Sequence, residues 1–219
     1  MWCIATITPE YRTRMYDVLD LYEEPYNPKR PVLGLDEKPK QLLEDSRTPI
    51  PMQQGKPAKQ DYEYKRRGTA NIFVCVEPKG GRRTTCVTKR RTKKDFAQFI
   101  KTLIDEEYPE AECLRLVIDN LNTHNETSLF ETFDEKEARR ILDKIEWHYT
   151  PKHASWLNVA EIEIGIMDSQ CTGRRIKDIE LLTKEVAAWN TQRNEMQVNI
   201  NWQFTRQKAD EKLGKHYTE

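Results

Sequence analysis

The run Leu114-Arg115-Leu116-Val117-Ile118-Asp119-Asn120 is the strongest strand signal in the chain. Its aliphatic and β-branched side chains favour a buried strand, and the run ends on two polar residues. A second apolar run, Val32-Leu33-Gly34-Leu35, also ends on an acidic residue, Asp36. Because ligand sites of open α/β sheets form at the ends of buried strands, these two runs predict a polar site at one sheet edge.

Further strands and helices alternate around these two runs. Strand-forming sequence covers residues 71–76, 84–88 and 146–150, and Gly80-Gly81 forms a turn between the first two. Helical patterns cover residues 9–22, 95–108, the region around 139–145, about 158–167 and 178–194. A proline-rich loop is expected directly after the strand at residues 32–35, and Asp95 is expected to cap the following helix. The element order predicts an α/β fold with a mixed sheet and helices on its faces.

The composition predicts a folded protein of the cytoplasm. The chain has 219 residues, of which 33% are charged, but it also carries five Trp, nine Tyr and six Phe. No apolar stretch is long enough for a membrane span, and no secretory signal is visible at the start. The five cysteines lack any CxxC pair, which disfavours a disulfide framework and a structural zinc site (Cys3, Cys75, Cys86, Cys113 and Cys171).

Charge is balanced overall but unevenly distributed. The chain has 36 basic and 36 acidic residues, yet residues 55–94 carry thirteen Lys or Arg against three acidic side chains. This segment therefore has a net charge of +10, and the remainder has −10. Such an asymmetry indicates a basic surface that faces a polyanion, although a solvated strand-and-loop surface is the simpler alternative.

Three acidic residues are candidates for a metal site. Asp36 and Asp119 end the two apolar runs, and Glu161 lies in the first turn of a helix after the last strand. Carboxylates that converge at a sheet edge repel one another unless a divalent cation neutralises them, and hard oxygen ligands favour Mg²⁺ or Mn²⁺. From spacing alone, a turn residue and two helix-terminus acids explain the three positions equally well. Glu163 competes with Glu161, since two residues along a helix the side chain points to a different face.

The sequence motifs around these acids resemble those of a known family. Three stretches, residues 32–37, 116–124 and 149–161, closely resemble the DDE catalytic domain of the mariner-like transposases, most closely the insertion sequence 630 family of bacteria. The resemblance continues through Trp189-Asn190 and Trp202-Gln203-Phe204. It implies an RNase H-like fold in which Asp36, Asp119 and Glu161 are the catalytic, metal-binding triad. It also implies a cofactor of two Mg²⁺ or Mn²⁺ ions.

Other residues receive supporting roles from the same comparison. Asn120 and His124 match the family motif and could orient the scissile phosphate or support the metal ligands. The alternative for His124 is a structural role, which is more common for a lone His after a strand. Lys152 and His153 precede the helix that carries Glu161 and could contact phosphates. The basic hairpin is the candidate for contact with the DNA backbone, through Arg82, Arg83, Lys89, Arg90 and Arg91.

The expected organisation has three parts. Residues 1–31 form an N-terminal helical extension or remnant linker, residues 32–195 the catalytic domain, and residues 196–219 a C-terminal tail. The resemblance implies cleavage and strand transfer on double-stranded DNA, at transposon ends and target, by a homodimer associated with the bacterial nucleoid. The family's helix-turn-helix part is not visible, so it is expected to be separately encoded or joined by a frameshift. Two alternatives are another RNase H-like nuclease and an inactive remnant that only binds DNA or protein.

Overall fold

The computed structural model describes residues 7–121 and 124–218, so Cys3 and the motif residues Asn122 and Thr123 lie outside the described residues. The strands are β1 (Val32–Asp45), β2 (Tyr64–Glu77), β3 (Arg82–Thr88), β4 (Leu114–Ile118) and β5 (Ile145–Tyr149). The α-helices are α1 (Pro9–Glu23), α2 (Lys93–Thr102), α3 (Thr127–Phe130), α4 (Glu135–Leu142), α5 (Ala160–Met167), α6 (Ile179–Glu195) and α7 (Arg206–Leu213). This order confirms the predicted one up to α6, and α7 is a further helix that the sequence did not indicate.

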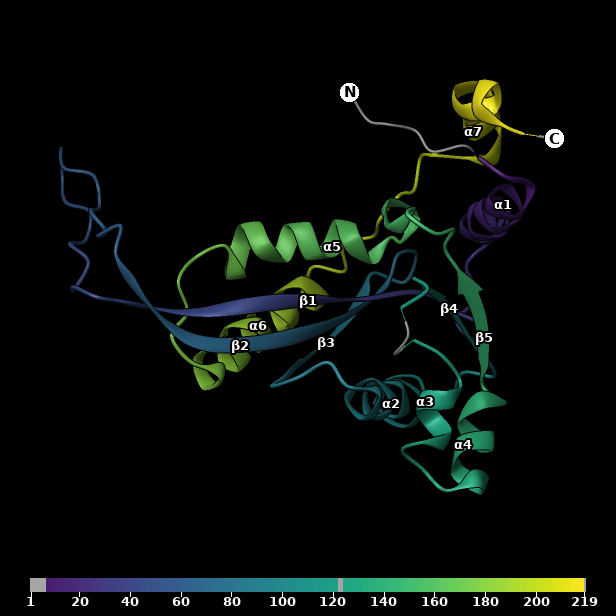
Figure 1. Ribbon diagram of the computed structural model, residues 1–219, viewed down its shortest axis with the longest axis horizontal. Helices are drawn as coiled ribbons and strands as arrows, with labels where there is room; N and C mark the ends of the chain where they lie inside the picture. The colour runs from purple at the N-terminus through teal and green to yellow at the C-terminus, as the bar shows by residue number, and fades with distance from the viewer. Residues whose placement is uncertain (1–6, 122–123, 219) are drawn as a thin grey trace.

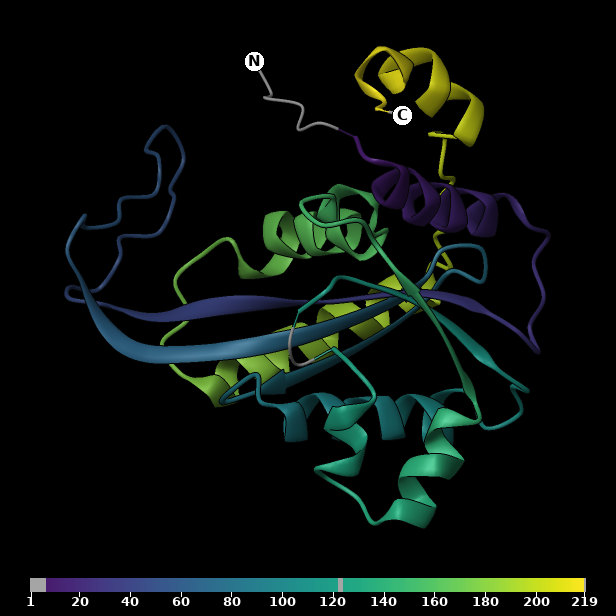
Figure 2. The same cartoon turned by 45° about the vertical axis from the view of Figure 1, so that its right-hand side comes forward.

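The five strands form one mixed sheet with the order β3-β2-β1-β4-β5 (Figure 1). β1, β2 and β3 pair antiparallel as a meander, whereas β4 joins β1 in parallel and β5 joins β4 in parallel. Helices cover the sheet on both faces, with α5 on one side and the group α2, α3 and α4 on the other (Figures 1 and 2). The predicted α/β fold with mixed strand directions is confirmed.

Strand alternation divides the core between the two faces. Leu35 and Ile118 point to the face covered by α2, α3 and α4, in one cluster with Phe96. Val74 points to the other face and packs in a second cluster with residues of α5 and α6. Because successive side chains of a strand point to opposite faces, Gly34 and Asp36 share the α5 face of β1.

β1 is longer than the sequence indicated. The expectation that the strand stops at Leu35 and enters a proline-rich loop is wrong, because β1 continues to Asp45 as a two-stranded ribbon with β2 (Figure 1). β4 no longer pairs with β1 there, so Pro39, which has no N–H, lies in an edge strand where proline is tolerated. The ribbon bends at a register shift between Gln41 and Leu43.

The cap of α2 also differs from the prediction. Thr92, rather than Asp95, is the N-cap, and its hydroxyl accepts a hydrogen bond from the Asp95 backbone N–H. The Asp95 carboxylate in turn accepts one from the Thr92 N–H, which completes a capping box. Asp95 therefore stabilises the same helix end from the third position.

The two ends of the described chain pack together. The N–H of Ile7 donates to the carbonyl of His216 at 3.1 Å, and α1 and α7 lie side by side (Figures 1 and 2). Met15 of α1 and Ala209 of α7 share a buried cluster with Val117 of β4. The division into extension, catalytic domain and tail stays a prediction, but both end segments contribute to one core with the sheet.

The start of α5 lies against the backbone of β1. A Cβ atom on Gly34 would come within 2.4 Å of Val159 Cγ1 and 3.0 Å of the Ala160 backbone N. Real Cβ atoms do not approach so closely, and Val159 and Ala160 are fully buried and have no room to retreat. The absence of a side chain at Gly34 therefore allows α5 to reach its position.

The variant Gly34→Ala tests this contact. We expect a loss of about 1–3 kcal/mol in the free energy of unfolding by urea, because the new methyl group overpacks a filled interface. Gly165→Ala in the same helix is the control, since nothing lies within 4 Å of its Cβ position and alanine favours a helix. Equal stability of the two variants would contradict the packing argument.

Candidate active site

Parallel pairing of β1 and β4 brings Asp36 and Asp119 together. Gly34 pairs with Val117, so the residues two positions further along each strand fall beside one another. Both acids share a face with Gly34 and Val117, which is the face that α5 covers. The structure therefore sets the two acids that end the apolar runs beside one another, although β1 itself continues past Asp36 to Asp45.

Asp36 is a buried carboxylate with few compensating contacts. Its Oδ1 accepts a hydrogen bond from the Glu37 N–H at 2.8 Å, and its Oδ2 lies 3.4 Å from Nδ2 of Asn158. Burial raises the pKa of Asp36 from 3.8 to about 7, and the charges of Glu161, Asp119 and Glu37 act in the same direction. Asp36, Asp119 and Glu161 are thus electrostatic neighbours, although they come from three different elements.

Asn158 is a site residue to which sequence reasoning gave no role. It is fully buried, and its Nδ2 donates to the carbonyl oxygen of Leu35 at 2.8 Å. Its Oδ1 accepts a hydrogen bond from the N–H of Ala160 at 3.1 Å. One amide therefore joins the β1 backbone beside Asp36 to the first turn of α5. The signal was its place three residues before Glu161, where a polar side chain stands among apolar ones.

Asp119 has a cationic partner. Its Oδ1 lies 2.7 Å from Nδ1 of His124 and accepts the N–H of Leu121 at 3.1 Å. Burial alone would raise the pKa of Asp119, but the hydrogen bond and charge of His124 outweigh burial and lower the pKa. Asp119 is therefore ionised under conditions in which Asp36 is partly protonated.

His124 is held between two carboxylates. Its Nε2 lies 2.7 Å from Oε2 of Glu37, and both side chains are almost fully buried. Burial lowers the pKa of His124, but the hydrogen bonds to Asp119 and Glu37 outweigh it and raise the pKa to about 9. Arg91 adds a further ion pair to Glu37 at 3.4 Å. Glu37 was quoted in the motif without a role, and its position next to Asp36 on the opposite face of β1 explains how it reaches His124.

Glu161 and Glu163 have different environments. Glu161 is exposed in the first turn of α5, and its charge acts on Asp36. Glu163 is fully buried, and its carboxylate pairs with Arg83 at 3.1 Å and with Arg193 at 3.0 Å. The carboxylate of Glu163 is therefore engaged by two guanidinium groups, and Glu161 is the one that remains available to the site.

Two residues expected at the DNA surface lie elsewhere. The prediction for Arg83 is wrong, because its side chain has no exposed surface and bonds to Glu163 in the core. Arg82 lies at the start of β3, where it pairs with Glu107 in a cavity next to the starting ends of β1 and β4. Asp119 follows the opposite end of β4, so Arg82 does not adjoin it.

The remaining basic candidates stay solvent-exposed. Lys89, Arg90 and Arg91 occupy the loop between β3 and α2, and the Arg91–Glu37 ion pair ties this loop to the site. Lys152 and His153 are exposed on the turn between β5 and α5. These residues could meet a phosphate backbone that approaches the carboxylates.

Asn120 joins two elements beside Asp119. Its Nδ2 donates to the carbonyl of Thr150 at the end of β5, at 2.6 Å. Its Oδ1 accepts a hydrogen bond from Arg14 of α1, also at 2.6 Å. Asn120 therefore holds the two parallel strand ends together at the site.

The donor chemistry of the three acids suits a hard divalent cation. Asp36, Asp119 and Glu161 offer only carboxylate oxygens, and the pKa of Asp36 is raised by burial and then further by the charges of the neighbouring acids. Within residues 7–121 and 124–218, no three His, Cys, Asp or Glu side chains are gathered tightly enough to coordinate one ion in this conformation. The arrangement defines an α/β protein with carboxylates on β1, directly after β4 and in the first turn of α5, a donor set that fits Mg²⁺ or Mn²⁺.

Comparison with known families places the chain. Residues 31–183 match the family of DDE superfamily endonucleases, and the chain belongs to this family. The predicted recognition of a DDE catalytic domain is confirmed, whereas its assignment to the insertion sequence 630 family stays a prediction. No curated protein sequence matches the chain. No helix in the described part of the chain is long and apolar enough to cross a membrane.

Solved structures share the fold. The chain is similar to the Mos1 mariner paired end complex with Mn, at 14% identity and a TM-score of 0.58, over 90% of this chain and 60% of that one. It is similar to the mariner Mos1 paired end complex with Mg, at 14% identity and a TM-score of 0.56, over 100% and 66%. The Mos1 strand transfer complex matches at 15% identity and 0.55, over 86% and 55%. These likenesses confirm the RNase H-like fold, and the chain spans about 60% of the length of the first structure.

The different environments of Glu161 and Glu163 predict unequal effects of the same substitution on stability. Glu163→Gln leaves two buried guanidinium groups without their counter-charge, so we expect a loss of about 3–5 kcal/mol in the free energy of unfolding. Glu161→Gln, the matched control, alters an exposed side chain and should change stability by less than about 0.5 kcal/mol. Urea unfolding of both variants checks this, and a larger loss for Glu161→Gln would contradict the assignment.

The raised pKa of Asp36 predicts that this residue destabilises the fold in a pH-dependent way. Between its ordinary pKa of 3.8 and about 7, folded Asp36 holds a proton that the unfolded chain releases, so stability falls as the pH rises through this window. We expect Asp36→Asn and the wild type to have equal melting temperatures near pH 4. As the pH rises to 8, the melting temperature of the variant should exceed that of the wild type by a growing margin. Thermal unfolding without divalent cations measures the difference. Asp143→Asn, on an exposed acid, should show no such trend.

Proposed function

We propose that this chain is the catalytic part of a DNA transposase that cleaves DNA at transposon ends and transfers the strand into a target. The observation that carries the proposal is the parallel pairing of β1 and β4, which sets Asp36 beside Asp119, with Glu161 in the first turn of the helix that packs on β1. Membership of the DDE superfamily endonucleases supports it, as does the fold shared with the Mos1 strand transfer complex.

The three carboxylates would hold two Mg²⁺ or Mn²⁺ ions. When bound, such ions lower the pKa of an attacking water or 3′-hydroxyl and stabilise the leaving oxygen of an in-line displacement. The protein's own contribution is positional. His124 fixes Asp119, and Asn158 fixes the backbone at Asp36 relative to α5, so the ligands require little rearrangement before reaction.

Double-stranded DNA would approach along exposed basic residues. Lys89, Arg90 and Arg91 lie on one loop and Lys152 and His153 on another, and contacts from these to phosphates would position the scissile bond without reading its sequence. Arg82 and Arg83 would not contact this DNA, because Arg83 is buried and Arg82 lines the cavity near the other end of β4. Recognition of the transposon ends would fall to a separately encoded or frameshift-fused helix-turn-helix part, and two copies of the chain would act together on DNA.

A plasmid-nicking assay tests the proposed activity. We expect the chain with Mn²⁺ to convert supercoiled plasmid into open circles, and Glu161→Gln and Asp119→Asn to lower the rate at least about 100-fold. Glu161→Gln is decisive because it should leave stability unchanged. The exposed Glu211→Gln serves as control and should nick like the wild type. Nicking that persists unchanged in both site variants would overturn the proposal.

A further inference from the structure

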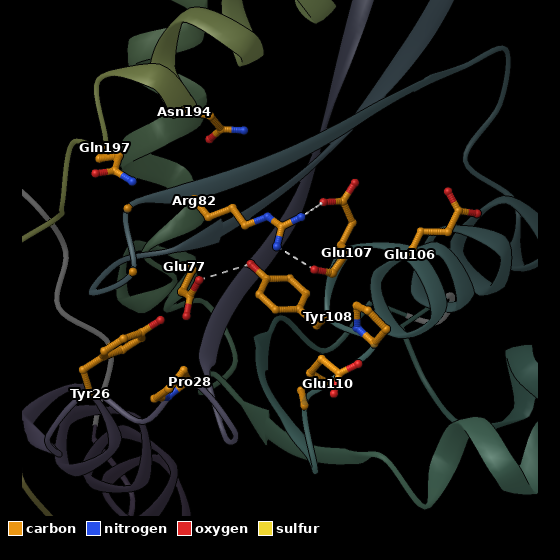
Figure 3. A pocket seen from close by; sticks show the side chains of 14 residues that line it. Tyr26, Pro28, Glu77, Arg82, Glu106, Glu107, Tyr108, Glu110, Asn194 and Gln197 are labelled. Carbon is orange, nitrogen blue, oxygen red and sulfur yellow. Dashed lines mark hydrogen bonds and ion pairs between the residues drawn. The ribbon is translucent and has the colours of Figure 1, made fainter.

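A second site lies at the other end of the sheet. A cavity of about 690 Å³ opens beside the starting ends of β1 and β4, whereas Asp119 follows the far end of β4 (Figure 3). The turn between β2 and β3 forms one wall, and the end of α6 forms another through Asn194 in its last turn and Gln197 just after it. Nothing in the proposed cleavage reaction uses this cavity.

Glu77 provides a buried carboxylate in this cavity. It ends β2, only 4% of it is exposed, and its Oε2 accepts a hydrogen bond from the Tyr108 hydroxyl at 3.4 Å. The side chain of Tyr26 points toward the same carboxylate (Figure 3). Gly80 leaves room for it, since a Cβ there would come within 2.4 Å of the Glu77 carboxylate. Burial raises the pKa of Glu77, and this effect outweighs the two phenols and the charge of Arg82, which lower it.

The cavity already binds one guanidinium group. Arg82 donates to the backbone carbonyl of Glu107 at 2.6 Å and forms an ion pair with the side chain of the same residue. Its guanidinium also lies 4.9 Å from the ring centre of Tyr108, in the geometry of a cation–π contact. The walls of this cavity are therefore suited to a planar organic cation.

The lining retains negative charge after this pair is formed. The charges of Arg82 and Glu107 cancel, which leaves Glu77 together with Glu106 and Glu110. Glu106 and Glu110 are exposed at the rim, and neither forms an ion pair within the described residues. A further cation entering between these carboxylates and the two tyrosine rings would be attracted by both charge and ring face.

We propose that this cavity is a binding site for a guanidinium or alkylammonium group, with Glu77 as its internal counter-charge and Tyr26 and Tyr108 as aromatic walls. The group is the terminus of an arginine or lysine side chain or of a free polyamine, which share this chemistry. The site is independent of the proposed DNA cleavage, because it uses different residues at a different end of the sheet.

Binding of N-acetylarginine amide, followed by NMR, tests the site. We expect saturable shifts of the Gly80 and Gly81 backbone amides, and no saturable shift with the neutral isostere N-acetylcitrulline amide. Glu110→Lys alters an exposed rim residue and should weaken binding at least about fivefold. Glu77→Gln should weaken it further if the variant folds. Glu211→Lys, on exposed α7, has the same charge change and should bind like the wild type.

Two results would overturn the proposal. One is the absence of saturable shifts at Gly80 and Gly81, and the other is equal binding by Glu110→Lys and Glu211→Lys, which would indicate only general charge attraction. Sedimentation of the wild type distinguishes the sources of the cation. Self-association that N-acetylarginine amide disperses and Glu110→Lys weakens identifies a side chain of a second copy. A monomer that binds the probe, and also binds spermidine at the same amides, identifies a free cation.

Discussion

The close approach of α5 to β1 is the constraint on which the site depends. Glu161 can reach Asp36 only if the helix lies almost against the strand backbone, and Gly34 is the position that permits this. Contact alone does not fix the rotation of the helix about its axis. The buried pairing of Glu163 with Arg83 and Arg193 does so, because any rotation would separate charges that have no water to replace their partners. Packing thus sets the distance of α5, and the ion pairs set which acid faces the site.

The electrostatics of the site work against stability. Asp36 would be more stable neutral or solvated, yet the fold places it in a buried position facing two other acids. Such local conflict is expected where residues are arranged for a ligand rather than for the folded state alone. His124 limits the conflict on one side, because its positive charge is shared between Asp119 and Glu37. The negative charge that remains is directed at the space between Asp36 and Glu161, where a cation would relieve it.

The sequence was most informative where structure follows from short-range pattern. The buried strand ending at Asp119, the helix of Glu161 and the turn at Gly80-Gly81 follow from periodicity and turn residues. The length of β1 did not, because its outer half is held by pairing with β2 rather than by its own composition. The burial of Arg83 could not be predicted either, since its partner Glu163 lies 80 residues away and neither local sequence indicates the other. Basic residues in a hairpin look alike in sequence, whether they face solvent or a buried acid.

The same β2–β3 hairpin separates two kinds of charge. Its far end leads into the exposed loop of Lys89 and Arg90 near the carboxylates, whereas its turn lies beside the cavity of Glu77. A polyanion attracted to the loop would be repelled by the cavity, and an organic cation would experience the reverse. Since β2 and β3 pair without a break from Asn71–Thr88 to Glu77–Arg82, the two regions are held apart by the length of the hairpin. The chain therefore has no net charge but an uneven charge distribution, in which opposite ends of one sheet favour ligands of opposite charge.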